Sequence, residues 1–152
     1  MKKKPLQKRK NYSELFTDVD SLKTIDSIRI SYFLVAVTAF FITEVGREVY
    51  RPYIYSNDIY DLGIADSIGN LGGIIVQIFF TLAILNSPKS KAYRVIIFLV
   101  IGYILYEILQ PYLPKGTFDW IDIYATLFGG FIALLIHSLI IKRIKSKVLF
   151  KF

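Results

Sequence analysis

The sequence predicts an all-α membrane protein: four transmembrane helices arranged as two parallel-repeat hairpins, preceded by an N-terminal interfacial helix. Composition is the first reason, because 54% of the 152 residues are hydrophobic, 16% are aromatic and the mean hydropathy is +0.47. A soluble domain of this size is rarely so apolar. The second reason is four mostly apolar stretches, 28–49, 66–85, 93–112 and 119–141. Each approaches the roughly 20 residues that cross a bilayer. The third reason is a similarity between the two halves of the chain.

The charge distribution predicts the orientation. Of the 19 cationic residues, eight lie before the first stretch or at its edge. Three more lie between the second and third stretches, and five lie after the fourth. Acidic residues collect in the other two connections. By the positive-inside rule, both termini of this multi-pass protein are expected in the cytoplasm and both hairpin loops outside. The basic flanks attract anionic membrane lipids, and this distribution argues against a nucleic-acid partner.

Residues 1–27 are expected to form a basic cytoplasmic arm followed by an amphipathic helix on the membrane surface. Asn11 and Glu14 resemble a capping box that starts this helix. Four acidic residues interrupt the segment before the first apolar run, which does not fit a cleavable signal peptide. Residues 28–152 are then one four-helix transmembrane domain with a basic cytoplasmic tail. Pro52 is expected to stop the first span.

Several chemistries have no candidate residues. The chain has no cysteine and one histidine, His137, so neither a disulfide nor a metal site is expected, and His137 is interpreted as a packing residue. Nucleophilic triads and phosphate-cradling glycine loops are absent from the sequence. No cofactor is expected, and a non-enzymatic role is favoured.

The internal repeat covers approximately residues 44–86 and 103–141. Each half consists of a helix that ends in an acid and a proline, an outer loop, and a helix that begins with an acid. Because both hairpins enter and leave on one side, the repeats are expected to be parallel and related by an axis along the membrane normal. The matched positions are Glu48, Arg51, Pro52 and Tyr53 with Glu107, Gln110, Pro111 and Tyr112, and Asp66, Asn70 and Gly73 with Asp122, Thr126 and Gly129.

This repeat predicts a polar site near the outer surface. Carboxylates within apolar spans must face protein or water, so they are expected to converge inside the bundle and to pair with cations, share protons or bind a ligand. Asp119 is interpreted mainly as a helix cap. Gly73, Gly129 and Gly130 are expected to allow close helix packing. The expected ligand-binding or polar-network residues are Glu48, Arg51, Asp66, Asn70, Glu107, Gln110, Asp119, Asp122 and Thr126.

The second hairpin resembles the signature of VanZ-like membrane proteins. The resemblance covers roughly residues 103–133. It rests on Glu107-Ile-Leu-Gln110, on Gly116-Thr117-Phe118-Asp119-Trp120-Ile121-Asp122, and on Thr126 with Gly129-Gly130-Phe131. Many members of that family have arginine where this chain has Thr117 and asparagine where it has Thr126. The first half supplies Arg51 and Asn70 instead. The resemblance implies a link to the cell envelope and to resistance against glycopeptides such as teicoplanin.

Three functions are weighed from the sequence. The first is a VanZ-like protein whose outer polar site binds or modulates an envelope component, such as a lipid-linked intermediate or a glycopeptide. The second is a small proton-coupled transporter that uses Glu48, Asp66, Glu107 and Asp122 as titrating groups. The third is a non-catalytic structural subunit whose polar cluster holds helices together. A homo-oligomer is left open in each case.

Overall fold

The fold is all-helical over the residues that the computed structural model describes, 12–85, 89–114 and 116–149, which contain no strand. The basic arm 1–11 lies outside them. Four helical segments, Ser27–Ser56, Ile64–Leu85, Lys91–Tyr112 and Trp120–Ile144, are long and apolar enough to cross a membrane, as expected. The elements in order are α1 (Tyr12–Val45), η1 (Gly46–Tyr50), α2 (Arg51–Ser56), α3 (Ile64–Leu85), α4 (Lys89–Leu109), η2 (Gln110–Tyr112) and α5 (Trp120–Leu149).

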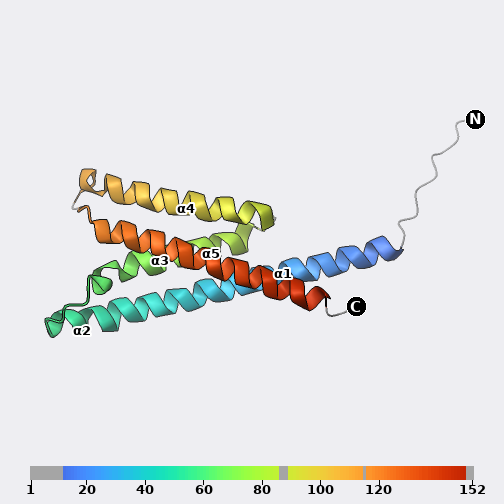
Figure 1. Ribbon diagram of the computed structural model, residues 1–152, viewed down its shortest axis with the longest axis horizontal. Coiled ribbons are helices and arrows are strands. Elements are labelled where there is room, and N and C mark those ends of the chain that lie inside the picture. Colours follow the sequence, from blue (N-terminus) through green and yellow to red (C-terminus); the bar gives the residue numbers. More distant parts are fainter. Residues whose placement is uncertain (1–11, 86–88, 115, 150–152) are drawn as a thin grey trace, which may run out of the picture.

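The helices form a bundle in which α3 and α5 lie between α1 and α4 (Figure 1). Helix α3 packs most extensively against α1 and α5, whereas the described residues of α1 and α4 do not contact each other. Both hairpin loops lie at one end of the bundle, and the start of α1 and the end of α5 lie at the other (Figure 1). We call the first of these the hairpin end.

The core is apolar, and so is much of the surface. Ile74, Ile78 and Phe79 are fully buried on α3. Large apolar side chains are exposed on every long helix, among them Phe41 and Phe98 at 63% and 72%. A soluble monomer rarely exposes so much contiguous apolar surface, whereas lipid chains cover it without cost. The outward face therefore fits the membrane character of the spans.

The first span departs from the sequence expectation at both ends. Helix α1 runs without a break from Tyr12, so a separate interfacial helix over 12–27 is not confirmed. At the other end the chain stays helical past Pro52, which contradicts the prediction that Pro52 stops the helix. The reason is η1, a π-helical turn in which the Arg51 amide donates to the Gly46 carbonyl. The wider turn places Pro52 in the first turn of α2, where its missing N–H is tolerated.

Two polar contacts tie the helices together far from the hairpin end. The Arg29 Nε atom donates to the Ala83 carbonyl at 2.9 Å, which satisfies one of the free carbonyls at the end of α3. His137 is completely buried, and its Nδ1 atom lies 2.7 Å from the Tyr32 hydroxyl. The Tyr93 ring packs edge-on against His137 at 4.8 Å. These contacts agree with a packing role for His137.

Candidate functional site

The hairpin end carries a set of polar side chains that descends from the surface into the bundle. We call it the outer polar cluster and define it by seven residues from four elements: Arg51, Tyr55, Asp66, Asn70, Glu107, Asp122 and Thr126. Asp66 and Asp122 each occupy the third position of a long helix, α3 and α5. Carboxylates in a first helical turn are favoured by the helix dipole and by free amides.

The surface layer is an ion pair reinforced by a tyrosine. The Arg51 Nη2 atom lies 3.5 Å from Asp66 Oδ1, and both side chains are about half exposed. The Tyr55 hydroxyl donates to the same carboxylate oxygen, and Arg51 Nε donates to the Tyr55 hydroxyl at 3.2 Å. The turn from η1 into α2 brings Arg51 and Tyr55 over the start of α3. An ion pair this exposed contributes little to stability, so its side chains are free to exchange partners.

Asp122 forms the middle layer. It is partly buried on α5 and interacts electrostatically with Asp66, Arg51 and Asn70. The charge of Asp122 also acts on Glu107. Asp122 therefore lies within electrostatic range of both the surface ion pair and the buried Glu107.

The deepest layer is a buried hydrogen bond between α3 and α4. The Asn70 Nδ2 atom donates to Glu107 Oε1 at 3.1 Å, and Glu107 is only 1% exposed. The second carboxylate oxygen, Oε2, is buried without a hydrogen-bond partner among the described residues. An unsatisfied buried polar atom is costly, so its retention needs a reason.

Thr126 is level with Asn70. Helices α3 and α5 run in the same direction, and a Cβ atom added at Gly129 would meet Ile74 and the Leu71 carbonyl. Three residues earlier on α5, Thr126 therefore lies beside the turn of α3 that carries Asn70. Its side chain is fully buried, and its hydroxyl has no partner among the described residues. Two unsatisfied oxygens, one from Glu107 and one from Thr126, thus occur within the same layer of the bundle.

Three of the expected site residues stand apart from the cluster. Glu48 is exposed and forms no ion pair within the described part of the chain, so the expectation that it faces the inside of the bundle is not confirmed. Glu48 lies in the π-helical turn 46–50, which departs from the ordinary helical spacing on which that expectation rested. Gln110 is partly buried, and its side chain has no hydrogen bond to a described residue. Asp119 precedes α5 and accepts the Ile121 amide at 2.9 Å, which agrees with its interpretation as a cap.

The glycines agree with expectation at two positions of three. A Cβ atom at Gly129 would lie 2.5 Å from Ile74 Cγ2, and one at Gly130 would lie 2.5 Å from Val100 Cγ2. At Gly73, however, a Cβ atom would meet only the Tyr103 hydroxyl at 3.9 Å, an ordinary contact. Its neighbour Gly72 makes the close approach instead, to Thr43 of α1. The expectation that Gly73 allows close helix packing is therefore wrong by one residue.

The sequence interpretation missed two residues that shape the site. Asp61 accepts the amides of Gly63 and Ala65 at 3.1 and 2.7 Å and the Tyr50 hydroxyl at 3.2 Å. It therefore caps the start of α3, and the cluster residue Asp66 follows Asp61 by five residues. Tyr55 was not among the expected site residues, yet it contacts both Arg51 and Asp66. The signal for Asp61 was present, because an aspartate two residues before a glycine is typical of a side-chain capped turn.

The chemistry of the cluster suits the binding of a polar group. The cluster holds three carboxyl groups and one guanidinium, so it suits cations and groups that donate hydrogen bonds. Its deepest oxygens are buried, and hydrogen bonds are stronger in such low-dielectric surroundings than at the surface. The described residues include no group of three or more metal-binding side chains placed to hold an ion.

Comparison with known proteins adds no relative. No protein-family model, curated protein or solved structure matches the chain.

Proposed function

We propose that this chain is a VanZ-like protein of the bacterial inner membrane whose outer polar cluster binds a lipid-linked component of the cell envelope. The observation that carries the proposal is the buried Glu107–Asn70 pair, with its unsatisfied carboxylate oxygen, below an exposed ion pair. An exposed ion pair above buried hydrogen-bond acceptors suits a ligand that donates hydrogen bonds, as sugar hydroxyls and ammonium groups do. The resemblance of residues 103–133 supports the envelope as the source of that ligand.

The internal repeat belongs to the same proposal. Exchange of the two hairpins would map α1 onto α4 and α3 onto α5. The helix contacts follow this exchange: α1 packs on α3 as α4 packs on α5, and α3 contacts α4 as α5 contacts α1. Asp66 and Asp122 occupy the same helical position. Glu48 and Gly73 depart from the symmetry, so the proposed site is shared by the halves without being symmetric.

The orientation can be tested with single cysteines, because the chain has none of its own. With cytoplasmic termini, Asn57→Cys and Lys115→Cys should react with an impermeant thiol reagent in intact cells. Lys89→Cys should react only after the cells are opened, because the positive-inside rule places it in the cytoplasm. Labelling at position 89 alone in intact cells would reverse the orientation and place the cluster on the cytoplasmic side.

The function is tested by teicoplanin susceptibility together with lipid analysis of the purified chain. Expression in a sensitive host should raise the inhibitory concentration of teicoplanin, and an envelope lipid should co-purify. Asp122→Asn should abolish both effects, since it removes the charge at the centre of the cluster. Lys142→Gln, an exposed change at the opposite end of the bundle, is the control. Unchanged susceptibility with no lipid bound would contradict the proposal.

A second candidate, a proton-coupled carrier, is favoured by the same buried carboxylate. Glu107 could take up and release a proton as a substrate passes, and acids within spans often serve this purpose. Flux into proteoliposomes that follows a pH gradient and is lost in Glu107→Gln would support the carrier. Flux no greater than that of protein-free vesicles, with or without the gradient, would exclude the carrier.

A further inference from the structure

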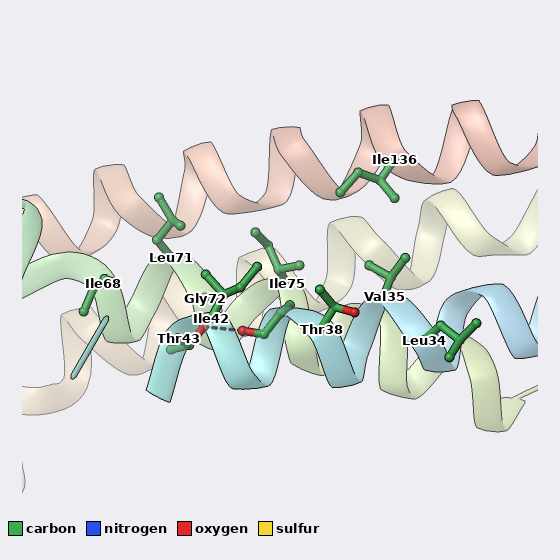
Figure 2. Close-up of a pocket in the computed structure, with 11 residues that line it drawn as sticks. Leu34, Val35, Thr38, Ile42, Thr43, Ile68, Leu71, Gly72, Ile75 and Ile136 are labelled. Atoms are coloured by element: carbon green, nitrogen blue, oxygen red, sulfur yellow. Dashed lines mark hydrogen bonds between the residues drawn. The ribbon is translucent and has the colours of Figure 1, made fainter. Parts of the chain in front are cut away.

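A second site lies in the apolar part of the bundle. A cavity of about 430 Å³ opens between α1 and α5, with α3 as its floor (Figure 2). Its lining includes Leu34, Thr38 and Ile42 of α1, Ile75 of α3 and Ile136 of α5. Leu34 and Ile42 are 59% and 66% exposed, so the cavity is open to the surroundings of the spans. We call it the α1–α5 groove.

The groove has almost no polar character. Thr43 also lines it, but its hydroxyl already donates to the Ala39 carbonyl at 2.7 Å. The other lining side chains are aliphatic except for Thr38. A groove of this composition within spanning segments can be filled only by hydrocarbon or by apolar side chains, because water would lose its hydrogen bonds there.

The groove crosses the middle of the spans. The midpoint of the α3 span lies between Ile74 and Ile75. At a rise of about 1.5 Å per residue, the lining residue Ile68 lies about 10 Å from this midpoint toward the hairpin end. Thr43 is level with Gly72, so Leu34, nine residues away on α1, lies about 10 Å beyond the midpoint on the other side.

The extent of the groove across the membrane determines how long a bound hydrocarbon chain must be. The hydrocarbon core is about 30 Å thick, and an ordinary phospholipid chain ends near its middle. A single chain that fills the groove from the hairpin end must pass the midplane and continue for about another 10 Å. Only a chain longer than those of common phospholipids can do this.

A helix of a second copy fits the groove poorly. An α-helix with its side chains is about 10–12 Å wide, and membrane helices approach one another over small residues. Gly72, the glycine of the groove, is already covered by Thr43. The groove thus lacks the open small-residue surface that a second helix would need.

The hairpin end of the groove also carries a suitable charge. Arg47 lies four residues beyond Thr43, in η1, and its side chain is 52% exposed. Its ion pair is the exposed contact with Glu44 at 3.3 Å, which a phosphate can replace with little loss. Arginine side chains at this depth extend toward the headgroups, so Arg47 can meet a phosphate above the groove.

We propose that the α1–α5 groove binds the hydrocarbon chain of a polyisoprenoid phosphate lipid, with the phosphate at Arg47. This inference rests on the proposed function, since it identifies the lipid of a lipid-linked envelope component. It adds a chain-binding site, separate from the outer polar cluster, that selects for chain length.

Native mass spectrometry of the purified full chain, titrated with undecaprenyl phosphate, tests the groove. The wild-type chain should retain one lipid, and it should bind dioleoyl phosphatidylglycerol at least about tenfold more weakly. Thr38→Phe fills the groove and should weaken undecaprenyl phosphate binding by about tenfold or more. Ile97→Phe, at an exposed position of α4 outside the groove lining, is the matched control and should bind as wild type does.

A second variant distinguishes a blocked groove from a misfolded protein. Thr38→Cys can be purified first and then modified with a bulky maleimide, which blocks the groove after folding. Bound undecaprenyl phosphate should slow this modification, whereas Ile97→Cys should react at the same rate with or without lipid. Equal binding of both lipids would contradict the proposed selection for chain length. If filling the groove at position 38 had no effect on binding, the proposal that the groove binds the lipid chain would be wrong. A dimer that Thr38→Phe dissociates would instead identify a second copy as the occupant.

The two proposals fail separately. Loss of lipid retention in Thr38→Phe concerns the groove, whereas loss of teicoplanin resistance in Asp122→Asn concerns the outer polar cluster. If Asp122→Asn loses resistance but binds undecaprenyl phosphate normally, the cluster recognises the group attached to the lipid. If the groove variants bind normally while Asp122→Asn loses resistance, the groove proposal is wrong and the proposed function stands.

Discussion

Replacing Gly129 by leucine is expected to destabilise the bundle by about 3 kcal/mol, the upper end of overpacking effects. A Cβ atom at this position would lie 2.5 Å from Ile74 Cγ2 and 2.7 Å from the Leu71 carbonyl oxygen. The side chain of Ile74 can move, but the carbonyl belongs to the backbone of α3. Helices α3 and α5 must therefore separate, and they form the central contact of the bundle. Unfolding in a denaturing detergent, followed by circular dichroism, measures the loss.

Two other glycines provide matched controls. Gly102 of α4 is exposed, and a Cβ atom there would meet nothing within 4 Å, so Gly102→Leu should be neutral or slightly stabilising through its better helix propensity. Gly73→Leu should fall between the two because only Tyr103 lies near. If Gly129→Leu were as stable as Gly102→Leu, the close contact between α3 and α5 would be wrong.

Hydropathy and spacing predicted most of the architecture, because both report burial in a membrane directly. Four apolar stretches became four long helices, and Asp119 became a cap through local geometry alone. The failures occurred where a local rule depended on tertiary context. Pro52 normally ends a helix, yet a π-helical turn just before it lets the chain continue. No sequence pattern distinguishes that turn from an ordinary helix end.

Spacing also predicted the positions of several polar residues, whereas ligand binding by these residues stays a prediction. Asp66, Asp122, Asn70 and Glu107 lie together because spacing along helices of known direction fixes depth and face. The inward orientation expected of Glu48 is not confirmed, because this residue is exposed. That expectation assumed 3.6 residues per turn, whereas residues 46–50 form a π-helical turn. Tyr55 was missed because its role requires α2 to fold over the start of α3. Such a contact depends on the loop between the helices, which the helical periodicity does not describe.

Variants of the buried pair Asn70 and Glu107 should separate an effect on the free energy of unfolding from an effect on ligand binding. Asn70→Leu removes the donor to Glu107 Oε1 and leaves both carboxylate oxygens unpaired in the bundle. The expected cost is about 1–3 kcal/mol for an unpaired polar group, rising to about 3–5 kcal/mol if the carboxylate is ionised. Gln77→Leu on the exposed face of α3 is the control, and it should leave stability unchanged.

The double variant Asn70→Leu/Glu107→Leu decides what the pair is for. Replacing both partners by apolar side chains removes the unsatisfied atoms, so unfolding stability should return to that of the wild type or above it. If the cluster binds an envelope ligand, teicoplanin resistance and lipid co-purification should stay lost in this stable protein. If the pair only holds α3 and α4 together, the double variant should recover resistance along with stability. Recovery of both would make the chain a structural subunit, because a binding site does not survive the loss of its buried acceptors.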